Sequence, residues 1–191
     1  MTRIIAGDLK GRTLKVPPSV TRPTSSRVRE AMFSSLEHAH GGLDDVRVLD
    51  LFAGSGALAI ESLSRGAQYA ELMESDAKAV STIKDNLKAL NLNAQVVGGD
   101  LFTHLANGSS SGGFDVVFAD PPYGLADERM THMLELLRDG NWLRDDAVIV
   151  VERDKRSACE WPDGFGDIEQ RSYGDTVVWY GHFIGSDEEQ S

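Results

Sequence analysis

The sequence contains a single cysteine, Cys159, so no intrachain disulfide and no thiolate metal cluster can form within one chain. It also lacks a long hydrophobic run. Its apolar stretches, such as residues 116–119 and 147–151, are far shorter than the ~20 residues that cross a bilayer. The apolar patch at the N-terminus meets a charge too early for a secretory signal. We therefore expect a cytoplasmic protein with no membrane partner.

Apolar residues make up 41% of the chain and charged residues 26%, which excludes a mainly disordered, collagen-like or coiled-coil protein. A length of 191 residues predicts one compact domain with short tails. From composition and pattern we expect a basic N-terminal extension with a helix over residues 1–40. The main domain then covers residues 41–184, and residues 185–191 form an acidic tail that does not pack.

Positive charge is scarce overall but concentrated at the start. The net charge is −11, yet residues 1–40 hold seven basic and three acidic side chains. Charges more than about 10 Å apart are largely screened, so a basic face can bind phosphates on an acidic protein. A solvated basic segment without a partner is the alternative, and for any single basic residue a surface charge or an intramolecular ion pair is the favoured interpretation. The candidate phosphate contacts are Arg3, Lys10, Arg12, Arg22, Arg27 and Arg29.

From residue 46 onward, apolar strand patterns alternate with helical patterns. Strands are predicted at residues 46–51, 69–74, 94–97, 114–119 and 147–152. Helices are predicted at residues 25–38, 56–65, 77–90 and 127–138. This alternation predicts an α/β fold with a doubly wound, mostly parallel sheet. Residues 168–172 and 176–183 break the alternation around Gly174-Asp175 and predict a terminal antiparallel hairpin.

A glycine-containing loop follows the first of these strands, in the segment Asp50-Leu51-Phe52-Ala53-Gly54-Ser55-Gly56. Glycines there allow a tight turn and a close approach of ligand to backbone N–H groups. Glu74 lies 20 residues after Gly54 at the end of the next strand, where a carboxylate binds ribose hydroxyls. Together they indicate an adenosine-type ligand without choosing between NAD and S-adenosylmethionine. A turn with no ligand is the alternative.

Two further acids bear on that choice. Asp50 suits the cationic groups of S-adenosylmethionine better than an anionic pyrophosphate, although it is also explained by hydrogen bonds to loop N–H groups. Asp100 follows the strand at 94–97 and is placed to accept from an adenine amino group, with Leu101 beside the ring. Helix capping by Asp100 explains its position equally well.

The fourth strand ends in Asp120-Pro121-Pro122-Tyr123, a stiff segment whose prolines lack N–H groups. In a sheet of order 3-2-1-4-5 this segment faces the glycine loop. An exocyclic amine of a nucleobase is a poor nucleophile, and two acceptors, Asp120 and a carbonyl such as that of Pro121, would hold its two hydrogens. Tyr123 would stack on the base, a contact worth about 1 to 3 kcal/mol. Methyl transfer by in-line displacement then needs alignment and no metal. An ordinary rigid turn is the alternative.

These motifs resemble the class I S-adenosylmethionine-dependent amino-methyltransferases, whose signature is Asp/Asn-Pro-Pro followed by an aromatic residue. A closer resemblance is to the RsmD family of small-subunit ribosomal RNA guanine-N2 methyltransferases, and it covers nearly the whole chain. The segments that resemble the family are residues 3–7, 11–12, 22–24, 27–30, 50–56, 64–67 and 120–123. Lys10 and Ala59 stand where the family pattern leads us to expect arginine and glycine.

The resemblance implies a Rossmann-like methyltransferase domain that methylates N2 of one guanine in 16S rRNA, in an assembled or assembling small subunit. S-adenosylmethionine is the implied donor, S-adenosylhomocysteine the product, and a monomer suffices. The implied catalytic residues are Asp120, Pro121, Pro122 and Tyr123. The implied cofactor-binding residues are Asp50, Phe52, Ala53, Gly54, Gly56, Glu74, Asp100 and Leu101. Two other functions stay open: an NAD-dependent oxidoreductase and a non-catalytic RNA-binding module.

Overall fold

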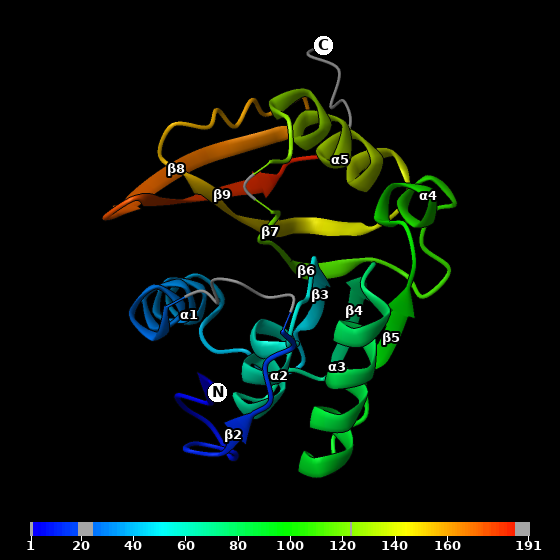
Figure 1. Cartoon of the computed structure of the whole chain (residues 1–191). Coiled ribbons are helices and arrows are strands. Elements are labelled where there is room, and N and C mark those ends of the chain that lie inside the picture. The colour runs from blue at the N-terminus through cyan, green and yellow to red at the C-terminus, as the bar shows by residue number, and fades with distance from the viewer. Residues whose placement is uncertain (1, 19–24, 123, 186–191) are drawn as a thin grey trace. The chain divides into compact units, whose positions relative to one another are not determined.

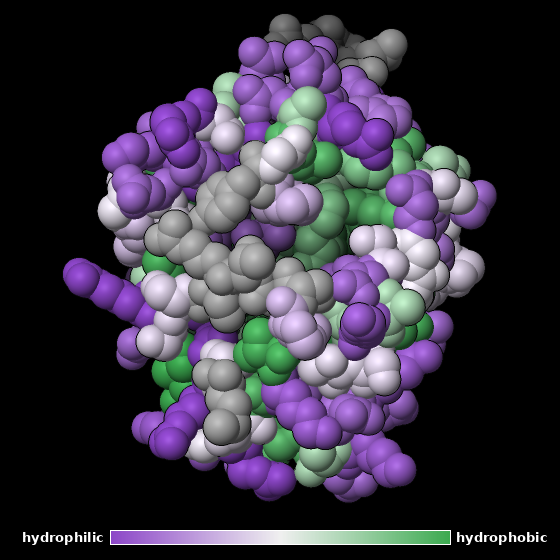
Figure 2. All heavy atoms as spheres, viewed as in Figure 1, coloured by the Kyte–Doolittle hydropathy of each residue, from purple (hydrophilic) through white to green (hydrophobic). Residues whose placement is uncertain are grey.

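The computed structural model describes residues 2–18, 25–122 and 124–185, and the chain divides into two compact units, Met1–Asp100 and Leu101–Ser191. Within the described residues, no helix is long and apolar enough to cross a membrane. The face in Figure 2 is covered mostly by hydrophilic residues, with hydrophobic ones reaching the surface in small patches.

The first unit is a parallel three-stranded sheet segment with helices and a short N-terminal ladder (Figure 1). Its sheet order is β5-β4-β3, and both pairings are parallel. Nearly every residue of β3 and β4 after the first is buried, including the acids Asp50 and Glu71, which is typical of strands covered on both faces. The elements are β1 (Thr2–Arg3), β2 (Thr13–Leu14), α1 (Ser26–His40), β3 (Arg47–Leu51), α2 (Ala57–Ser64), β4 (Tyr69–Glu74), α3 (Ala77–Leu90) and β5 (Gln95–Gly98).

Helix ends in this unit follow from local side chains. Ser25 caps α1 by accepting from the Val28 N–H, and Asp76 caps α3 by accepting from the Lys78 N–H. Asn91 ends α3 in the left-handed region, with φ 54°. These caps explain why the predicted bounds of both helices are close to the observed ones.

The N-terminal segment, residues 2–18, packs into the core of the first unit. Residues Thr2–Arg3 pair antiparallel with Thr13–Leu14, and Ile4 and Leu14 are 2% and 1% exposed. Both belong to the same hydrophobic cluster as Ile60, Leu72 and Ile83 of the α2, β4 and α3 elements. Residues 2–18 of the basic extension expected from the sequence are therefore docked onto the core of this unit.

The second unit contains four strands in the order β6-β7-β9-β8. The β6–β7 pair is parallel, and the β7–β9 and β9–β8 pairs are antiparallel. Gly174, at φ 65°, lies in the turn between β8 and β9, which confirms the predicted terminal hairpin. The elements are α4 (Leu101–Ala106), β6 (Phe114–Ala119), α5 (Asp127–Asp139), β7 (Leu143–Asp154), β8 (Phe165–Tyr173) and β9 (Thr176–Phe183).

Three elements of this unit differ from the sequence prediction, and one of them, β8, begins three residues before the predicted 168–172. The six-residue helix α4 was not predicted, because so short a segment shows little periodicity. Tertiary contacts support it: the Trp142 indole N–H donates to the Leu105 carbonyl at 3.0 Å. The β7 strand is longer than the predicted 147–152, since its polar first half, including Asp145, carries no strand signal. The division at residues 40 and 184 stays a prediction.

Candidate functional site

The glycine loop follows β3 and adopts a backbone that most residues avoid. Phe52, Gly54 and Gly56 have φ values of 60°, 57° and 77°. A non-glycine residue at positive φ is uncommon, and such backbones cluster at functional sites. The Gly56 N–H donates to the Ala53 carbonyl at 2.7 Å, and the Ala53 N–H donates to the Met73 carbonyl of β4 at 3.0 Å. The loop is therefore held in one conformation by its own backbone and by the sheet.

Glu74, the last residue of β4, lies beside this loop as the spacing predicted. Its Oε2 accepts from the Gly54 N–H at 2.8 Å and its Oε1 accepts from the Asp76 N–H at 2.8 Å. The Ser75 hydroxyl also donates to Oε1, at 3.5 Å, so acceptor capacity for a ligand hydroxyl remains mainly on Oε2. Glu74 is partly exposed, which leaves it accessible to a ligand.

Asp50 lies in β3 and is 2% exposed. Its Oδ2 accepts from the Ala59 N–H, in the first turn of α2, at 3.1 Å. This bond ties Asp50 to α2, whereas the hydrogen bonds to loop N–H groups considered from the sequence stay a prediction. Ala59 is fully buried, so its methyl group fills core space where the family pattern led us to expect glycine.

The end of β5 supplies the third acid. Gly98, Gly99 and Asp100 are all exposed, and the Gly99 N–H donates to the Glu74 carbonyl at 3.1 Å. Leu101 is 8% exposed and begins α4. Asp50, Glu74 and Asp100 therefore come from three neighbouring parallel strands, the last two at their carboxyl ends.

This arrangement fits S-adenosylmethionine. Adjacent strands are about 4.8 Å apart, so the ends of β3 and β5 are about 10 Å apart. Along that edge lie a glycine loop with a nearby carboxylate, then Glu74 with spare acceptor sites, then the exposed Asp100. These groups suit a cationic amino-acid end, a ribose diol and an adenine amine respectively. In the described part of the chain, no group of three or more His, Cys, Asp or Glu side chains is arranged to hold a metal ion, and chemistry without a metal stays a prediction.

In the second unit, the predicted catalytic segment begins directly after the buried strand β6. Asp120 is partly buried, Pro121 is buried and Pro122 is exposed. The Pro122 carbonyl accepts from the Leu125 N–H at 2.9 Å, which closes a turn. Of the two proline carbonyls, that of Pro121 is thus the better candidate acceptor for a substrate. Tyr123 lies outside the described residues.

Arg153 of β7, which was not predicted as a site residue, anchors the chain just after this segment. The side chain is buried, its Nη1 donates to the Leu125 carbonyl at 3.2 Å, and its Nη2 donates to Asp127 Oδ1 at 2.5 Å. The other oxygen of Asp127 accepts from the Ala158 N–H at 3.4 Å. Arg153 therefore fixes the first residue of α5 and the chain two residues before it. Because Arg153 lies between Glu152 and Asp154, nothing in the sequence pattern indicated that it is buried.

The N-terminal segment is held by one buried carboxylate, Glu61 of α2, which is 1% exposed. Its two oxygens accept from the Ile5 and Ala6 N–H groups at 2.8 and 2.9 Å, and Oε1 also accepts from Arg65 Nε at 3.0 Å. Glycine is required at position 7, since a Cβ there would lie 1.7 Å from the Ser64 carbonyl oxygen.

Arg29 corrects one sequence prediction. It is 2% exposed, and its guanidinium donates to Thr2 Oγ1 at 3.0 Å and to the Arg3 carbonyl at 2.5 Å. Its Nε lies 3.9 Å from Glu61 Oε2. Burial lowers the pKa of Arg29, opposed by the charge of Glu61. Arg29 is therefore a structural cation that fixes the N-terminal segment, and it is not available to a phosphate.

The other candidate phosphate contacts lie at the surface or outside the described residues. Arg3, Lys10 and Arg27 are exposed. Arg12 is also exposed, and its Nη2 donates to the Ala89 carbonyl of α3 at 3.3 Å. Arg22 lies outside the described residues.

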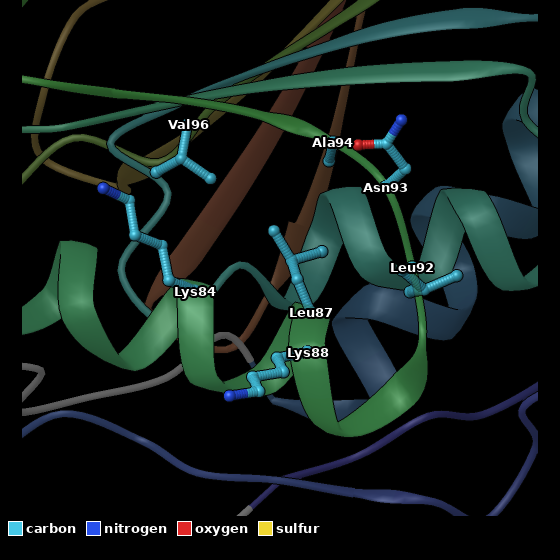
Figure 3. Close-up of a pocket in the computed structure, with 7 residues that line it drawn as sticks. All are labelled: Lys84, Leu87, Lys88, Leu92, Asn93, Ala94 and Val96. Carbon is cyan, nitrogen blue, oxygen red and sulfur yellow. The ribbon is translucent and has the colours of Figure 1, made fainter.

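A shallow groove on α3 adds two lysines that the sequence analysis did not single out. It has a volume of about 290 Å³ and a floor that includes Leu87, Leu92 and Val96 (Figure 3). Lys84 and Lys88 line it, and no ion pair to either is found among the described side chains. Their 4-residue spacing on one helix face is the signal that was available in the sequence.

Comparison with known proteins gives consistent matches along most of the chain. The family model described as conserved hypothetical protein 95 matches residues 2–182. Ribosomal RNA small subunit methyltransferase D of Escherichia coli K12 is 42% identical over 154 residues, 78% of this chain and 73% of that protein. The protein of the same name from Haemophilus influenzae is 35% identical over 179 residues, 90% of this chain and 89% of that protein.

Solved structures agree with the predicted fold class. The Escherichia coli protein yhhF has a TM-score of 0.81 and 35% identity, and the match covers 97% of this chain and 99% of that one. The 16S rRNA N2 G1207 methyltransferase RsmC of Thermus thermophilus, solved with AdoMet and guanosine, has a TM-score of 0.70. That match covers 92% of this chain and 46% of that chain at 22% identity, so it supports the fold alone. The α/β, Rossmann-like class I methyltransferase fold is confirmed. Because the family model matches most of the residues and relatives above 30% identity cover more than two thirds of the sequence, the chain belongs to the family described as conserved hypothetical protein 95, the RsmD family.

Proposed function

We propose that this chain is an S-adenosylmethionine-dependent enzyme that methylates the exocyclic N2 of one guanine in 16S rRNA. The main supporting observation is the Asp120-Pro121-Pro122 segment at the end of the buried strand β6, because it offers acceptors and few donors. Membership of a family whose relatives are ribosomal RNA small subunit methyltransferases gives the substrate class. The assembled or assembling small subunit is the substrate form that we propose.

In this proposal, Asp120 and the Pro121 carbonyl accept the two hydrogens of the guanine amine. Holding both hydrogens favours a pyramidal nitrogen whose lone pair points away from the ring. The Pro122 carbonyl is occupied by the Leu125 N–H, which leaves the Pro121 carbonyl for this task. Asp120 needs to act only as an acceptor, because the family signature also permits asparagine at this position.

The cofactor, when bound, supplies an activated methyl group on a sulfonium. The chain would bind it with the glycine loop at Phe52, Ala53, Gly54 and Gly56, with Asp50 setting the negative charge nearby. Glu74 would accept from the ribose hydroxyls with its spare lone pairs, while Asp100 and Leu101 would bind the adenine. The transfer is an in-line displacement, and the protein contributes alignment and electrostatic complementarity.

We propose that Arg3, Lys10, Arg12 and Arg27, together with Lys84 and Lys88, bind RNA phosphates. Arg12 contacts the last turn of α3, whereas Asp76 caps its first turn beside Glu74. A helix of 14 residues is about 21 Å long. Phosphate contacts at the Arg12 end are thus about 20 Å from the cofactor edge, so they would position a large RNA and not the target base itself.

The test is transfer of labelled methyl groups to small ribosomal subunits that lack the modification, with mapping of the methylated position by mass spectrometry. Replacing Asp120 with alanine removes one acceptor and should cost about 2 to 4 kcal/mol of transition-state stabilisation, a loss of about 30- to 1000-fold in rate. Asp120→Asn keeps an acceptor oxygen and should lose less. Asp145→Ala is the control, because that side chain is exposed at the start of β7.

Calorimetry separates this proposal from an oxidoreductase. S-adenosylhomocysteine should bind and NAD should not, since the acidic groups along the strand ends repel a pyrophosphate. Unchanged turnover in Asp120→Ala would remove Asp120 from the mechanism. Binding of NAD with no methyl transfer would overturn the function.

A further inference from the structure

A single buried amide, that of Asn86 on α3, connects the N-terminal segment to the glycine loop. Its Oδ1 accepts from the Lys15 N–H at 2.9 Å. Its Nδ2 donates to the Lys15 carbonyl at 2.9 Å and to the Ser55 carbonyl at 3.1 Å. The residue is 4% exposed, so these bonds are shielded from water.

The two bonds to Lys15 fix the main chain of the N-terminal segment. The Asn86 side chain forms hydrogen bonds with both the N–H and the carbonyl of Lys15, as a neighbouring β-strand would. An ion pair between the Lys15 and Asp85 side chains lies beside it, but both groups are more than half exposed, so solvent and salt weaken that pair. The attachment at residue 15 therefore depends mainly on Asn86.

The third bond fixes one peptide plane of the glycine loop. The carbonyl of the Ser55–Gly56 peptide accepts from Asn86, and its N–H donates to the Ala53 carbonyl at 2.7 Å. Both sides of this peptide are thus bonded, and the left-handed backbone at Gly56 follows from its orientation. Movement of Asn86 would rotate this peptide plane, which lies in the glycine loop directly before α2.

We propose that Asn86 is a positioning residue that couples RNA binding on the N-terminal segment to cofactor binding in the glycine loop. This inference rests on the proposed function. RNA bound to the N-terminal segment would further stabilise the docked conformation in which the Lys15 backbone holds Asn86, and Asn86 holds the Ser55–Gly56 peptide. Linkage is reciprocal, so the cofactor must tighten RNA binding by the same factor that RNA tightens cofactor binding.

The test compares binding of the full chain to small subunits lacking the modification, with and without saturating S-adenosylhomocysteine. For the unsubstituted protein we expect S-adenosylhomocysteine to lower the dissociation constant about 5-fold or more, the lower end of typical coupling. Asn86→Ala should reduce that ratio to about 1. Asn86→Asp should do the same, since a carboxylate oxygen would then face two carbonyl oxygens. Asn107→Ala, at an exposed position after α4, should keep the full ratio.

A measurement on the unsubstituted protein removes any dependence on how the variants fold. S-adenosylhomocysteine should slow hydrogen exchange at the Lys15 N–H, which bonds to Asn86, about 5-fold or more. The Ile4 N–H, which bonds to the Arg12 carbonyl at 3.0 Å, is the comparison within the same segment and should change less.

The outcomes separate the two proposals. A protein that methylates subunits but shows a coupling ratio of 1, or an Asn86→Ala variant that keeps the original ratio, overturns the coupling and leaves the proposed function standing. Unchanged exchange at Lys15 on cofactor binding overturns it as well. A protein that binds neither subunits nor S-adenosylhomocysteine contradicts the proposed function itself.

Discussion

Replacing Glu61 with alanine should loosen the N-terminal segment at Ile5 and Ala6, while the hydrogen bonds of Ser64 to residues 6, 8 and 9 remain. The carboxylate is 1% exposed, accepts from the Ile5 and Ala6 N–H groups, and neutralises Arg65 at 3.0 Å and Arg29 at 3.9 Å. Removing one partner of a buried ion pair typically costs about 3 to 5 kcal/mol, because the remaining charge stays buried. For a chain of this size, each kcal/mol lowers the melting temperature by about 2 to 4 °C. We therefore expect a decrease of about 6 to 20 °C.

Urea denaturation followed by circular dichroism measures the loss of stability, and hydrogen exchange locates it. The Ile5 and Ala6 amides should exchange much faster in Glu61→Ala, because their acceptor is gone. Glu61→Gln keeps the size and one acceptor oxygen, so its effect should be smaller. Glu30→Ala is the matched control: the residue is exposed on α1, and substitution there should change stability by no more than about 0.5 kcal/mol. A loss below about 1 kcal/mol for Glu61→Ala, with unchanged exchange at Ile5 and Ala6, would refute this account of the segment.

Two further predictions follow from burial and backbone geometry. Gly7→Ala should destabilise the protein far more than Gly11→Ala: both have positive φ, but a Cβ at position 7 lies 1.7 Å from the Ser64 carbonyl oxygen, whereas nothing lies within 4 Å at position 11. The melting temperatures of the two variants measure the difference. A side chain at positive φ alone costs about 1 to 2 kcal/mol of stability. Equal losses of stability in the two variants would show that only this backbone cost matters and that the contact with Ser64 does not. Burial raises the pKa of Cys159 to about 12, so at pH 8 its thiolate fraction is about 1000-fold below that of an ordinary thiol. Labelling with a thiol reagent should be slow until urea unfolds the protein, and fast labelling of the native state would contradict this burial. As pH rises, the Cys159 thiol loses its proton near pH 9 in the unfolded chain but only near pH 12 in the folded protein. The unfolded state therefore gains from deprotonation over this range, and the free energy of unfolding falls as pH rises from about 9 to 12.

The sequence by itself predicted the secondary structure of the parallel strands and the chemistry at their ends. The β4 and β6 strands and the α3 helix have their predicted bounds, because apolar runs, helical periodicity and caps depend on residues close together in the chain. The same holds for the glycine loop and for Glu74, whose hydrogen bond to the Gly54 N–H spans only 20 residues along one strand–helix–strand unit.

Only the tertiary structure decided which polar residues are internal. Glu61, Asn86 and Arg153 look like ordinary surface residues in the sequence, yet their partners lie up to 56, 71 and 28 residues away. Arg29 was predicted to bind phosphate because local charge cannot show that a helix face is buried against the N-terminal segment. Periodicity records which face of an element is apolar, whereas the pairing of a buried polar group depends on which distant segment folds against it.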